Sequence, residues 1–575
     1  MKRIVLFGDS LTQYGLGCER AFSLGAPGWG DRLVEVYSRR ADVLNRGCTL
    51  YNTRAALATE LVPSQVEGAE HEVLFATVWF GANDSCDPNV DKTKHVPLEE
   101  YERNLRAIAE RASKLTSRII FLTPPPINAE WYRRWRLPQV NNDEALVPDR
   151  KNPLIQMYAD ACKRVAAGLN APCLDVFNHF HSVGDWDKTL ISEDDGLHLS
   201  GAGDKLVFDL IMDVIRKTWP EIAVHPCKIT KNFSNSGSSC EAVPPRQPFW
   251  DKIDTRDYRR QLGEVDLGRD DDDGVITWPS RPAFVFVGDS ITQQGQGSPS
   301  WCQAPVTDSF STAAGWGDLV AARYSRRVDV YNRGLAGYNS KWCLAAFESL
   351  FPTQDRRRSP VELVTIFFGA NDAADAALNP VQHVSLVEFE SNVEELVRRC
   401  KNEWDARRIV VIGCPPIDRD KYLAWRRNRT GNENKTEEEL TDRTSEVARR
   451  YSLAAERVAN KHKTPFIDVF DLFGLHPSEF LSDGLHLSPK GNRALGQKLL
   501  AVMDERWPEL KCVQDPVRRR FGFQGSTCHA FAPEQPWFME INWAELTSGA
   551  EEVKKTTKPK DDAKDAQKAH KRVKL

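Results

Sequence analysis

The hydrophobic pattern of the first half of the chain predicts strands that alternate with helices. Short, mostly continuous apolar runs have the length of buried strands, and they lie at 3–7, 42–45, 73–80, 118–123 and 172–176. Between these runs apolar residues recur every three or four positions, and one helix face would hold Leu98, Tyr101, Leu105, Ile108, Ala112 and Leu115. Apolar strands separated by helices indicate a parallel sheet that is covered on both sides. The pattern therefore predicts a three-layer α/β/α sandwich.

The same pattern returns in the second half of the chain. Strand-like runs lie near 283–287, 328–331, 361–368, 408–412 and 465–469. Short motifs also return in the same order: GDSLTQYG (8–15) as GDSITQQG (288–295), NRGCTLYN (45–52) as NRGLAGYN (332–339), FGAND (80–84) at 368–372, and DGLHLS (195–200) at 483–488. A repeat unit of this length is a domain rather than a solenoid module. The chain is therefore predicted to contain two tandem copies of one α/β domain with a parallel central sheet.

The predicted domain boundaries follow the ends of the repeat. The first domain spans 1–255 and the second spans 278–545. The intervening segment 256–277 contains the acidic run Asp270–Asp273, whose like charges indicate a linker. Residues 546–575 are rich in lysine and poor in apolar side chains, which predicts a disordered tail. The basic end of this tail is compatible with a localisation signal, but a plain solvated tail is the preferred interpretation.

Composition narrows the classes of function. Of the 575 residues, 41% are hydrophobic and 27% are charged, as in an ordinary soluble globular protein. The formal net charge of −4 is small for this length, so no overall field recruits nucleic acid or an anionic membrane. No apolar run approaches membrane-spanning length, and the N-terminal run is too short for a signal peptide. We expect a cytoplasmic protein that acts on a small molecule, and the sequence does not predict its oligomeric state.

The 13 cysteines are expected to be reduced thiols. They form no C-x-x-C pair and no tight Cys/His cluster, so we expect no metal site. Cys227 and Cys240 lie in a region that corresponds to that of Cys512 and Cys528. This correspondence leaves open a disulfide or a metal at these two places.

Reactive side chains follow the predicted strands in both copies. Ser10 and Ser290 come directly after the first strand, Asn83 and Asn371 follow the third, and an Asp-x-x-His pair follows the fifth. Active groups in open parallel sheets gather beyond the carboxyl ends of the strands. The reactive side chains of each copy are therefore expected at one edge of its sheet.

Each of these residue types has a role in acyl transfer. A neutral histidine can take the proton of a serine hydroxyl, and a carboxylate fixes the histidine tautomer. The candidate catalytic sets are Ser10, Asp195 and His198 in the first copy and Ser290, Asp483 and His486 in the second. Candidate donors to an oxyanion are the Asn83 and Asn371 side chains and the backbone N–H groups of Ser290 and Gly337.

Each motif taken alone also has a structural interpretation. Gly-Asp-Ser and Gly-Ala-Asn-Asp are common turn sequences, and Asp-x-x-His often caps a helix. The ordered set of all three, behind the predicted strands and present twice, favours the catalytic interpretation. Neither serine lies in a G-x-S-x-G elbow, and neither glycine-rich stretch has the spacing of a phosphate loop or a dinucleotide fingerprint.

With these motifs each copy resembles the SGNH (GDSL-type) hydrolase family, and most closely its isoamyl acetate-hydrolysing esterase group. GWGDRL (28–33), HVPLEEY (95–101) and PPPI (124–127) extend the resemblance. It implies a flavodoxin-like fold, no metal or organic cofactor, and hydrolysis of short-chain, acetyl-type carboxylic esters through an acyl-serine intermediate, a reaction of lipid metabolism. The family's serine, glycine, asparagine and Asp/His blocks fall on Ser290, Gly337, Asn371, Asp483 and His486.

The first copy departs from the family pattern at one position, because Leu50 stands where the second copy has Gly337. The leucine side chain would crowd the acyl group, or its backbone would resist a positive φ that glycine adopts. We therefore expect a fully equipped second site. Whether the first copy is an active esterase or an impaired binding or regulatory module stays open. Acyl transfer to an alcohol and removal of O-acetyl groups from carbohydrates are further alternatives, since the acyl-enzyme is common to these reactions.

Overall fold

The computed structural model describes residues 2–16, 27–63, 73–224, 281–296, 314–352, 359–429, 432, 434–514 and 526–528. Residues Met1–Gln535 form one compact unit. The predicted linker 256–277 and the predicted tail 546–575 lie outside the described residues. The domain boundaries therefore stay a prediction.

The first copy is built on a five-stranded, all-parallel sheet. Its strands are β1 (Lys2–Gly8), β2 (Ala41–Gly47), β3 (Val73–Trp79), β4 (Ile119–Leu122) and β5 (Cys173–Leu174). They are ordered β2-β1-β3-β4-β5. The residues of β1 from Ile4 to Phe7 are fully buried, as expected for a strand covered on both faces. This sheet confirms the predicted α/β fold class.

Helices connect the strands of the first copy. They are α1 (Ser10–Gln13), α2 (Trp29–Val36), α3 (Thr53–Ala58), α4 (Leu98–Ser113), α5 (Ala129–Arg136), α6 (Asn152–Gly168), α7 (Val176–His181), α8 (Trp186–Thr189) and α9 (Gly201–Thr218), with short 3-10 turns η1 (Leu137–Val140), η2 (Glu144–Leu146) and η3 (Pro220–Ile222). Helix α2 packs against α9, and α4 packs against α3 and α6. The buried face of α4 includes Tyr101, Leu105, Ile108 and Ala112, as the helical period predicts.

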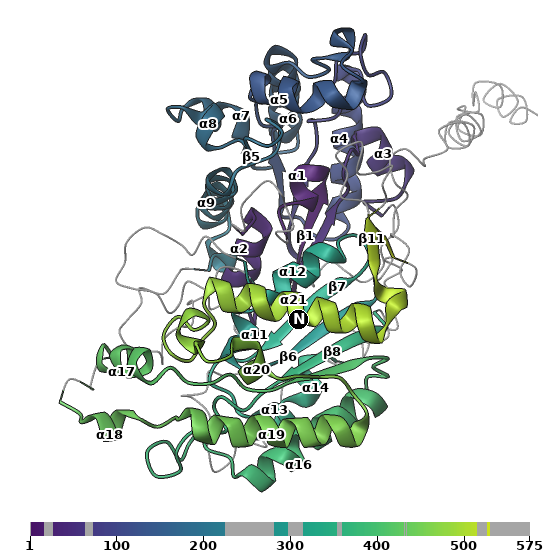
Figure 1. Ribbon diagram of the computed structural model, residues 1–575. Helices are drawn as coiled ribbons and strands as arrows, with labels where there is room; N and C mark the ends of the chain where they lie inside the picture. The colour runs from purple at the N-terminus through teal and green to yellow at the C-terminus, as the bar shows by residue number, and fades with distance from the viewer. Residues whose placement is uncertain are drawn as a thin grey trace, which may run out of the picture. The chain divides into compact units, whose positions relative to one another are not determined.

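The second copy repeats this arrangement (Figure 1). Its strands are β6 (Ala283–Gly288), β7 (Asp329–Gly334), β8 (Val361–Phe367), β9 (Ile409–Ile412) and β10 (Phe466–Ile467), in the order β10-β9-β8-β6-β7. Its helices are α11 (Ser290–Gln293), α12 (Trp316–Arg323), α13 (Ser340–Ala345), α14 (Phe347–Leu350), α16 (Leu386–Asn402), α17 (Arg419–Arg427), α18 (Glu437–Leu440), α19 (Ser445–His462), α20 (Val469–Phe473) and α21 (Pro489–Arg506), with η7 (Pro477–Glu479) and η8 (Pro508–Leu510). The strand order reverses at β1 and at β6, so each copy has its switch point beside its first strand.

The fifth strand of each copy is shorter than its apolar run predicts. Predicted at 172–176, β5 ends at Leu174, because the Asp175 carboxylate caps α7 by accepting a hydrogen bond from Asn178 N–H at 3.2 Å. Asp468 ends β10 in the same way by capping α20. The helix N-cap therefore decides where each strand stops.

The described cysteines include buried thiols at Cys86, Cys162, Cys343 and Cys400, in line with the expectation of reduced thiols. The strands β11 (Cys512–Gln514) and β12 (Ser526–Cys528) pair in antiparallel register, which places Cys512 opposite Cys528 along the backbone. Cys227, Cys240 and the side chain of Cys528 lie outside the described residues. The alternative of a disulfide or a metal at these places stays open.

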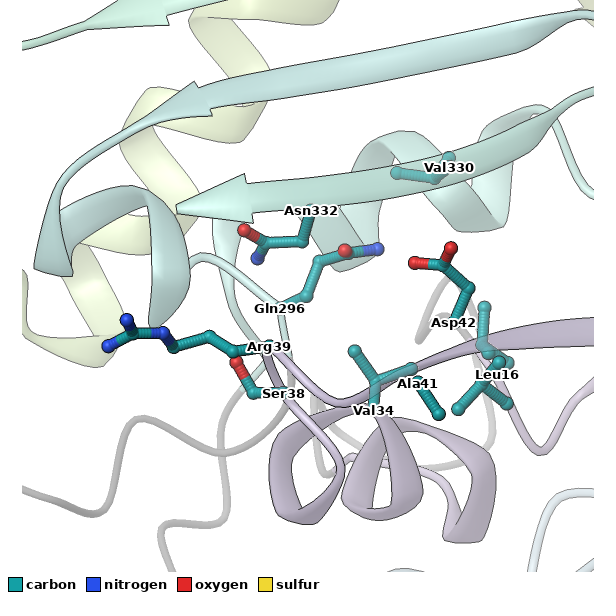
Figure 2. A pocket seen from close by; sticks show the side chains of 10 residues that line it. Leu16, Val34, Ser38, Arg39, Ala41, Asp42, Gln296, Val330 and Asn332 are labelled. Atoms are coloured by element: carbon teal, nitrogen blue, oxygen red, sulfur yellow. The ribbon is translucent and has the colours of Figure 1, made fainter. Parts of the chain in front are cut away.

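The edge strands β2 and β7 lie next to each other. Two ion pairs connect the copies at this place. Arg46 donates to both carboxylate oxygens of Asp329 at 2.8 and 2.9 Å. The corresponding Arg333 donates to both oxygens of Asp42 at 2.7 and 3.0 Å. Figure 2 shows a pocket lined from both copies, with Asp42 on one wall and Asn332 on the other. The two contacts are reciprocal, because each copy supplies the same arginine and the same aspartate.

These buried pairs predict a measurable cost when one partner is removed. The side chains of Arg46 and Asp329 are only 2% and 6% exposed. Arg46→Ala leaves a buried carboxylate without its bidentate partner and should destabilise the protein by about 3 kcal/mol, measured as a lower melting temperature. Arg398→Ala, which breaks an exposed pair on α16, serves as the control and should leave the melting temperature unchanged. A melting temperature of Arg46→Ala equal to that of the wild type would contradict this account.

Candidate active site

Each candidate serine begins a short helix at the carboxyl end of the first strand of its sheet. Ser10 opens α1 after β1, and Ser290 opens α11 after β6. The preceding aspartate caps the helix, since Asp9 accepts a hydrogen bond from Leu11 N–H at 2.9 Å. Both serines are 7% exposed. The strand-to-helix turn therefore fixes the position of the hydroxyl at the sheet edge.

The structure brings Ser10, Asp195 and His198 together. His198 lies on the loop between α8 and α9, and its Nε2 atom is 2.8 Å from Ser10 Oγ. Its Nδ1 atom forms a hydrogen bond with Asp195 Oδ2. The backbone N–H of His198 also donates to Asp195 Oδ1 at 2.9 Å. Hydroxyl, imidazole and carboxylate thus form one continuous line of hydrogen bonds.

The second copy contains the same line. His486 Nε2 is 2.8 Å from Ser290 Oγ, and His486 Nδ1 is 2.8 Å from Asp483 Oδ2. The backbone N–H groups of Leu485 and His486 donate to the other oxygen of Asp483 at 3.0 and 2.8 Å. Both candidate sets therefore meet at the edge of their sheet, as the order of motifs predicts. Their catalytic roles stay a prediction.

The carboxylate in the first copy is held in its charged form. Burial by itself raises the pKa of a carboxyl group. In Asp195 this effect is outweighed by the His198 ring and by the backbone N–H groups of His198 and Leu197, which together lower its pKa below the usual value. A charged carboxylate favours the tautomer with hydrogen on Nδ1 and leaves Nε2 to accept the serine proton.

A four-residue turn follows β2 and β7 and contains the glycine block. In both turns, residues 48–51 and 335–338, the N–H of the fourth residue donates to the C=O of the first at 3.0 Å. The third residue has a positive φ, +67° at Leu50 and +80° at Gly337. Turns of this kind favour glycine. Leu50 adopts this conformation, so the structure contradicts the expectation that its backbone would resist it, and the strain costs about 1–2 kcal/mol.

The asparagines after the third strands bind to the same turns. Asn83 Nδ2 donates to Tyr51 O at 2.9 Å, and Asn371 Nδ2 donates to Tyr338 O at 2.8 Å. Among the described residues each Nδ2 makes only this one strong bond, which leaves a second N–H for an oxyanion. Among the described residues the backbone N–H groups of Leu50 and Gly337, the third residues of the two turns, also make no hydrogen bond. In the first copy Ser10, Leu50 and Asn83 line one pocket.

A glutamine of the serine motif supports the turn, and sequence reasoning did not single it out. Gln13 Oε1 accepts a hydrogen bond from Thr49 N–H at 2.8 Å, and Gln293 Oε1 accepts one from Ala336 N–H at 2.8 Å. Gly47 allows this approach, because a Cβ there would lie 2.0 Å from the backbone nitrogen of Gln13. The available signal was the Thr-Gln pair shared by GDSLTQ and GDSITQ.

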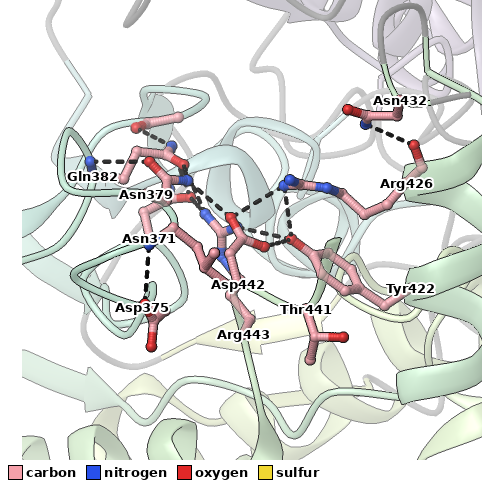
Figure 3. Close-up of polar contacts among 12 residues, drawn as sticks. Asn371, Asp375, Asn379, Gln382, Tyr422, Arg426, Asn432, Thr441, Asp442 and Arg443 are labelled. Atoms are coloured by element: carbon pink, nitrogen blue, oxygen red, sulfur yellow. Dashed lines mark hydrogen bonds and ion pairs between the residues drawn. The ribbon is translucent and has the colours of Figure 1, made fainter. Parts of the chain in front are cut away.

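A buried arginine, also missed by sequence reasoning, orients each asparagine. Arg150 Nη2 donates to Asn83 Oδ1 at 2.6 Å, and Arg443 Nη2 donates to Asn371 Oδ1 at 3.1 Å. Figure 3 shows Arg443 beside Asn371 and Asp442. Because arginine only donates, the amide oxygen must face it and the NH₂ group must face the turn. The signal in the sequence was the Asp-Arg pair that both copies contain.

The aspartate of each GDS motif is a buried acid with a displaced pKa. Burial raises the pKa of Asp9 to about 8 and that of Asp289 to about 7. Burial likewise raises the pKa of Asp84 and of Asp372 to about 6. Asp9 therefore keeps its proton at neutral pH in the folded protein. Its role at the site is to cap the helix that begins with the serine.

A pocket lies over the first site. It is lined by Ser10, His198, Asn83 and Leu50 together with the aromatic Tyr14 and Trp135. Leu50 therefore lines the same pocket as the serine, and crowding of the acyl group by its side chain stays a prediction. Among the described residues no His, Cys, Asp or Glu cluster has the arrangement of a metal site. Within the described part of the chain no helix has the length and apolar character needed to cross a membrane.

Both copies of the chain match one family model. The model of the GDSL-like Lipase/Acylhydrolase family matches residues 6–206 and 286–494. A GDSL esterase/lipase of Arabidopsis thaliana is 34% identical over 271 residues, which cover 46% of this chain and 98% of that protein. An isoamyl acetate-hydrolyzing esterase 1 homolog of Bos taurus is 35% identical over 220 residues, which cover 37% of this chain and 82% of that protein.

Two solved structures match parts of the chain. A lipase/acylhydrolase from Enterococcus faecalis is 23% identical with a TM-score of 0.27, covering 38% of this chain and 96% of that chain. An acetylxylan esterase from Geobacillus stearothermophilus is 21% identical with a TM-score of 0.27, covering 39% of this chain and 94% of that chain.

The parallel sheets and the two matched regions define a carboxylic ester hydrolase with two tandem domains. The chain belongs to the GDSL-like lipase/acylhydrolase family. The predicted family, fold class and enzyme class are confirmed. The cytoplasmic localisation and the independence from cofactors stay predictions.

The raised pKa of Asp9 predicts a pH dependence of stability. Between the usual carboxyl pKa of about 4 and the folded value of about 8, the folded state holds a proton that the unfolded state has released, so stability falls as pH rises. Asp9→Asn keeps an oxygen that can accept from Leu11 N–H and removes this titration. Its melting temperature should fall less than that of the wild type between about pH 5 and pH 8. An equal fall in both proteins would show that Asp9 does not titrate as described.

Proposed function

We propose that the second copy is a serine esterase in which Ser290 is the nucleophile. The observation that supports this most strongly is the hydrogen-bonded line from Asp483 through His486 to Ser290 Oγ. Asn371 in turn donates to the turn that contains Gly337. His486 takes the serine proton as Oγ attacks the ester carbonyl. The resulting oxyanion accepts hydrogen bonds from Asn371, from Gly337 N–H and from Ser290 N–H.

The same groups complete acylation and then carry out deacylation. The tetrahedral intermediate collapses, His486 returns its proton to the departing alcohol, and the acyl group stays on Ser290. Water then loses a proton to His486 and attacks the acyl-serine. The acid leaves and Ser290 regains its proton. Asp483 keeps its charge throughout and stabilises the imidazolium that forms in each step.

The preferred substrates under this proposal are short-chain, acetyl-type esters. Support comes from the isoamyl acetate-hydrolyzing esterase 1 homologs of cattle, mouse, human and rat, which are 33 to 35% identical to this chain. Nitrophenyl esters of increasing acyl length provide the test. Turnover should be highest for the acetyl and butyryl esters and should fall with longer chains, whereas a maximum at long chains would contradict the proposal.

The first copy is proposed to be a slower esterase with Ser10 as nucleophile. Its line of hydrogen bonds through His198 to Asp195 matches that of the second copy. Leu50 provides the backbone N–H in the strained conformation, and this residue lines the pocket. The handicap is therefore crowding of the acyl group together with strain in the turn, while every reactive group is retained.

The two nucleophiles can be separated by substitution in the full chain. Ser290→Ala or His486→Ala should remove most of the esterase turnover, because the second site has every expected group. The remaining turnover should disappear when Ser10→Ala is added, with a total loss of at least about 10³-fold. Full turnover in Ser290→Ala combined with loss in Ser10→Ala would reverse the assignment. Treatment with a chelator is the control for metal chemistry and should leave the rate unchanged.

The role of Leu50 can be tested in each direction. With Ser290→Ala present, Leu50→Gly should raise Ser10-dependent kcat by about tenfold. This is less than the 10²–10³ that loss of an oxyanion donor costs, because Leu50 retains its N–H. With Ser10→Ala present, Gly337→Leu should lower Ser290-dependent kcat by a similar factor. If the unmodified sites turn over at equal rates when measured separately, Leu50 is no handicap.

A further inference from the structure

Gln382 joins the two halves of the second oxyanion site. It lies on the segment between β8 and α16 and is 5% exposed. Its Nε2 atom donates to Gly337 O at 2.8 Å and to Asn371 Oδ1 at 3.1 Å. One amide group therefore contacts both the glycine of the turn and the asparagine side chain. Figure 3 shows Gln382 beside Asn371 and Asn379.

The orientation of this amide is fixed by its other neighbours. Gln382 Oε1 accepts a hydrogen bond from Arg443 Nη2 at 2.7 Å and from Asn379 Nδ2 at 2.9 Å. Asn379 Nδ2 also donates to Asp442 Oδ2 at 2.9 Å. Since an arginine cannot accept a hydrogen bond, the oxygen of Gln382 must face Arg443 and its NH₂ group must face the oxyanion site. A flipped amide would lose all of these bonds.

The first copy has an ion pair in the same place. Lys94 and Asp91 precede His95 at the same spacing at which Gln382 and Asn379 precede His383. Lys94 Nζ is 2.5 Å from Asp91 Oδ2 and 3.9 Å from Asp149 Oδ2. In the described part of the first copy the lysine donates neither to Leu50 O nor to Asn83. The neutral pair of the second copy thus links the oxyanion groups, and the charged pair of the first copy does not.

The backbones of the two segments accept the same hydrogen bond, so the difference between the copies lies in the side chains. Asn52 Nδ2 donates to Lys94 O at 2.8 Å, and the corresponding Asn339 Nδ2 donates to Gln382 O at 3.0 Å. Each segment is therefore anchored to the helix that follows its turn. The side chain at this position is Gln382 in the second copy and Lys94 in the first, and Gln382 donates a hydrogen bond to the third residue of its turn.

We propose that Gln382 is a positioning residue of the second site, holding the Gly337 peptide and the Asn371 amide together so that both face one oxyanion. Asn379 assists by holding Gln382. The Asp91–Lys94 pair does not supply this additional link in the first copy, where among the described residues Asn83 reaches the turn only through Tyr51 O, and this adds a second handicap to that of Leu50. This inference rests on the proposed serine mechanism.

The effect of such a residue falls on the transition state. The oxyanion exists only after the serine has attacked, so loss of alignment lowers kcat while substrate binding, and with it KM, changes little. Gln382 does not itself touch the oxyanion. The expected loss is therefore about tenfold, below the 10²–10³ that follows removal of a direct donor.

The experiment uses the full chain with Ser10→Ala, so that all turnover comes from Ser290. Gln382→Met removes the linking bonds with a side chain of similar length, and kcat for nitrophenyl acetate should fall about tenfold with KM changed less than twofold. Gln497→Met makes the same chemical change on the exposed side of α21 and is the control. Titration of active sites with a nitrophenyl phosphate ester counts folded sites, so that kcat is expressed per working site.

The reciprocal change tests the same idea by a gain of activity. With Ser290→Ala present, Asp91→Asn combined with Lys94→Gln transfers the neutral pair to the first copy. Ser10-dependent kcat should rise several-fold, and more so when Leu50→Gly is also present. This arm decides the matter if Gln382→Met yields too few folded sites to measure.

The outcomes separate this inference from the proposed function. An unchanged kcat per titrated site in Gln382→Met, or no gain from the transferred pair, overturns the positioning role while Ser290-dependent turnover persists. Turnover that survives in the protein with both serines replaced overturns the serine mechanism itself, and the positioning role with it.

Discussion

The place of the first strand within each sheet is the constraint on which the site depends. β1 lies between β2 and β3, and β6 lies between β7 and β8. Because the strands are parallel, their carboxyl ends share one edge, where the chain after the first strand carries the serine, after the second the turn, and after the third the asparagine. The loop of the histidine and aspartate then reaches the same edge from the far end of the copy. The line of hydrogen bonds from Asp483 to Ser290 is a consequence of this topology.

The two copies share this topology but differ in the contacts that position the proposed oxyanion donors, namely the third residue of the turn and the asparagine side chain. The turn requires a positive φ in both, and Leu50 meets this requirement at a cost in strain that Gly337 avoids. The arginine behind the asparagine is common to both copies, whereas among the described residues the bond from Gln382 to both Asn371 and Gly337 occurs in the second copy alone. The two copies thus share the same side chains at the sheet edge and differ in the hydrogen bonds that support them. Under the proposed mechanism this difference affects the rate of the reaction more than its type.

The sequence predicts the fold well, and it predicts which side chains meet at the edge of each sheet, because both depend on local patterns that occur twice. Apolar runs of strand length and the motifs behind them locate Ser290 and His486 without knowledge of distant contacts. It does not predict Gln13 or Arg443, because their roles depend on hydrogen bonds between segments whose distance apart only the folded chain defines. It also misjudges the backbone at Leu50, since the turn imposes a conformation that leucine disfavours on its own.

The central claim is that the serines after the first strands are nucleophiles of unequal reactivity. A fluorophosphonate that forms a stable bond with activated serines, followed by mass spectrometry of the digested full chain, tests this directly. The account predicts adducts on Ser290 and Ser10, with the Ser290 adduct forming faster, and no adduct on Ser290 when His486 is replaced by alanine. Absence of an adduct at both serines under conditions where esterase activity is inhibited would contradict it.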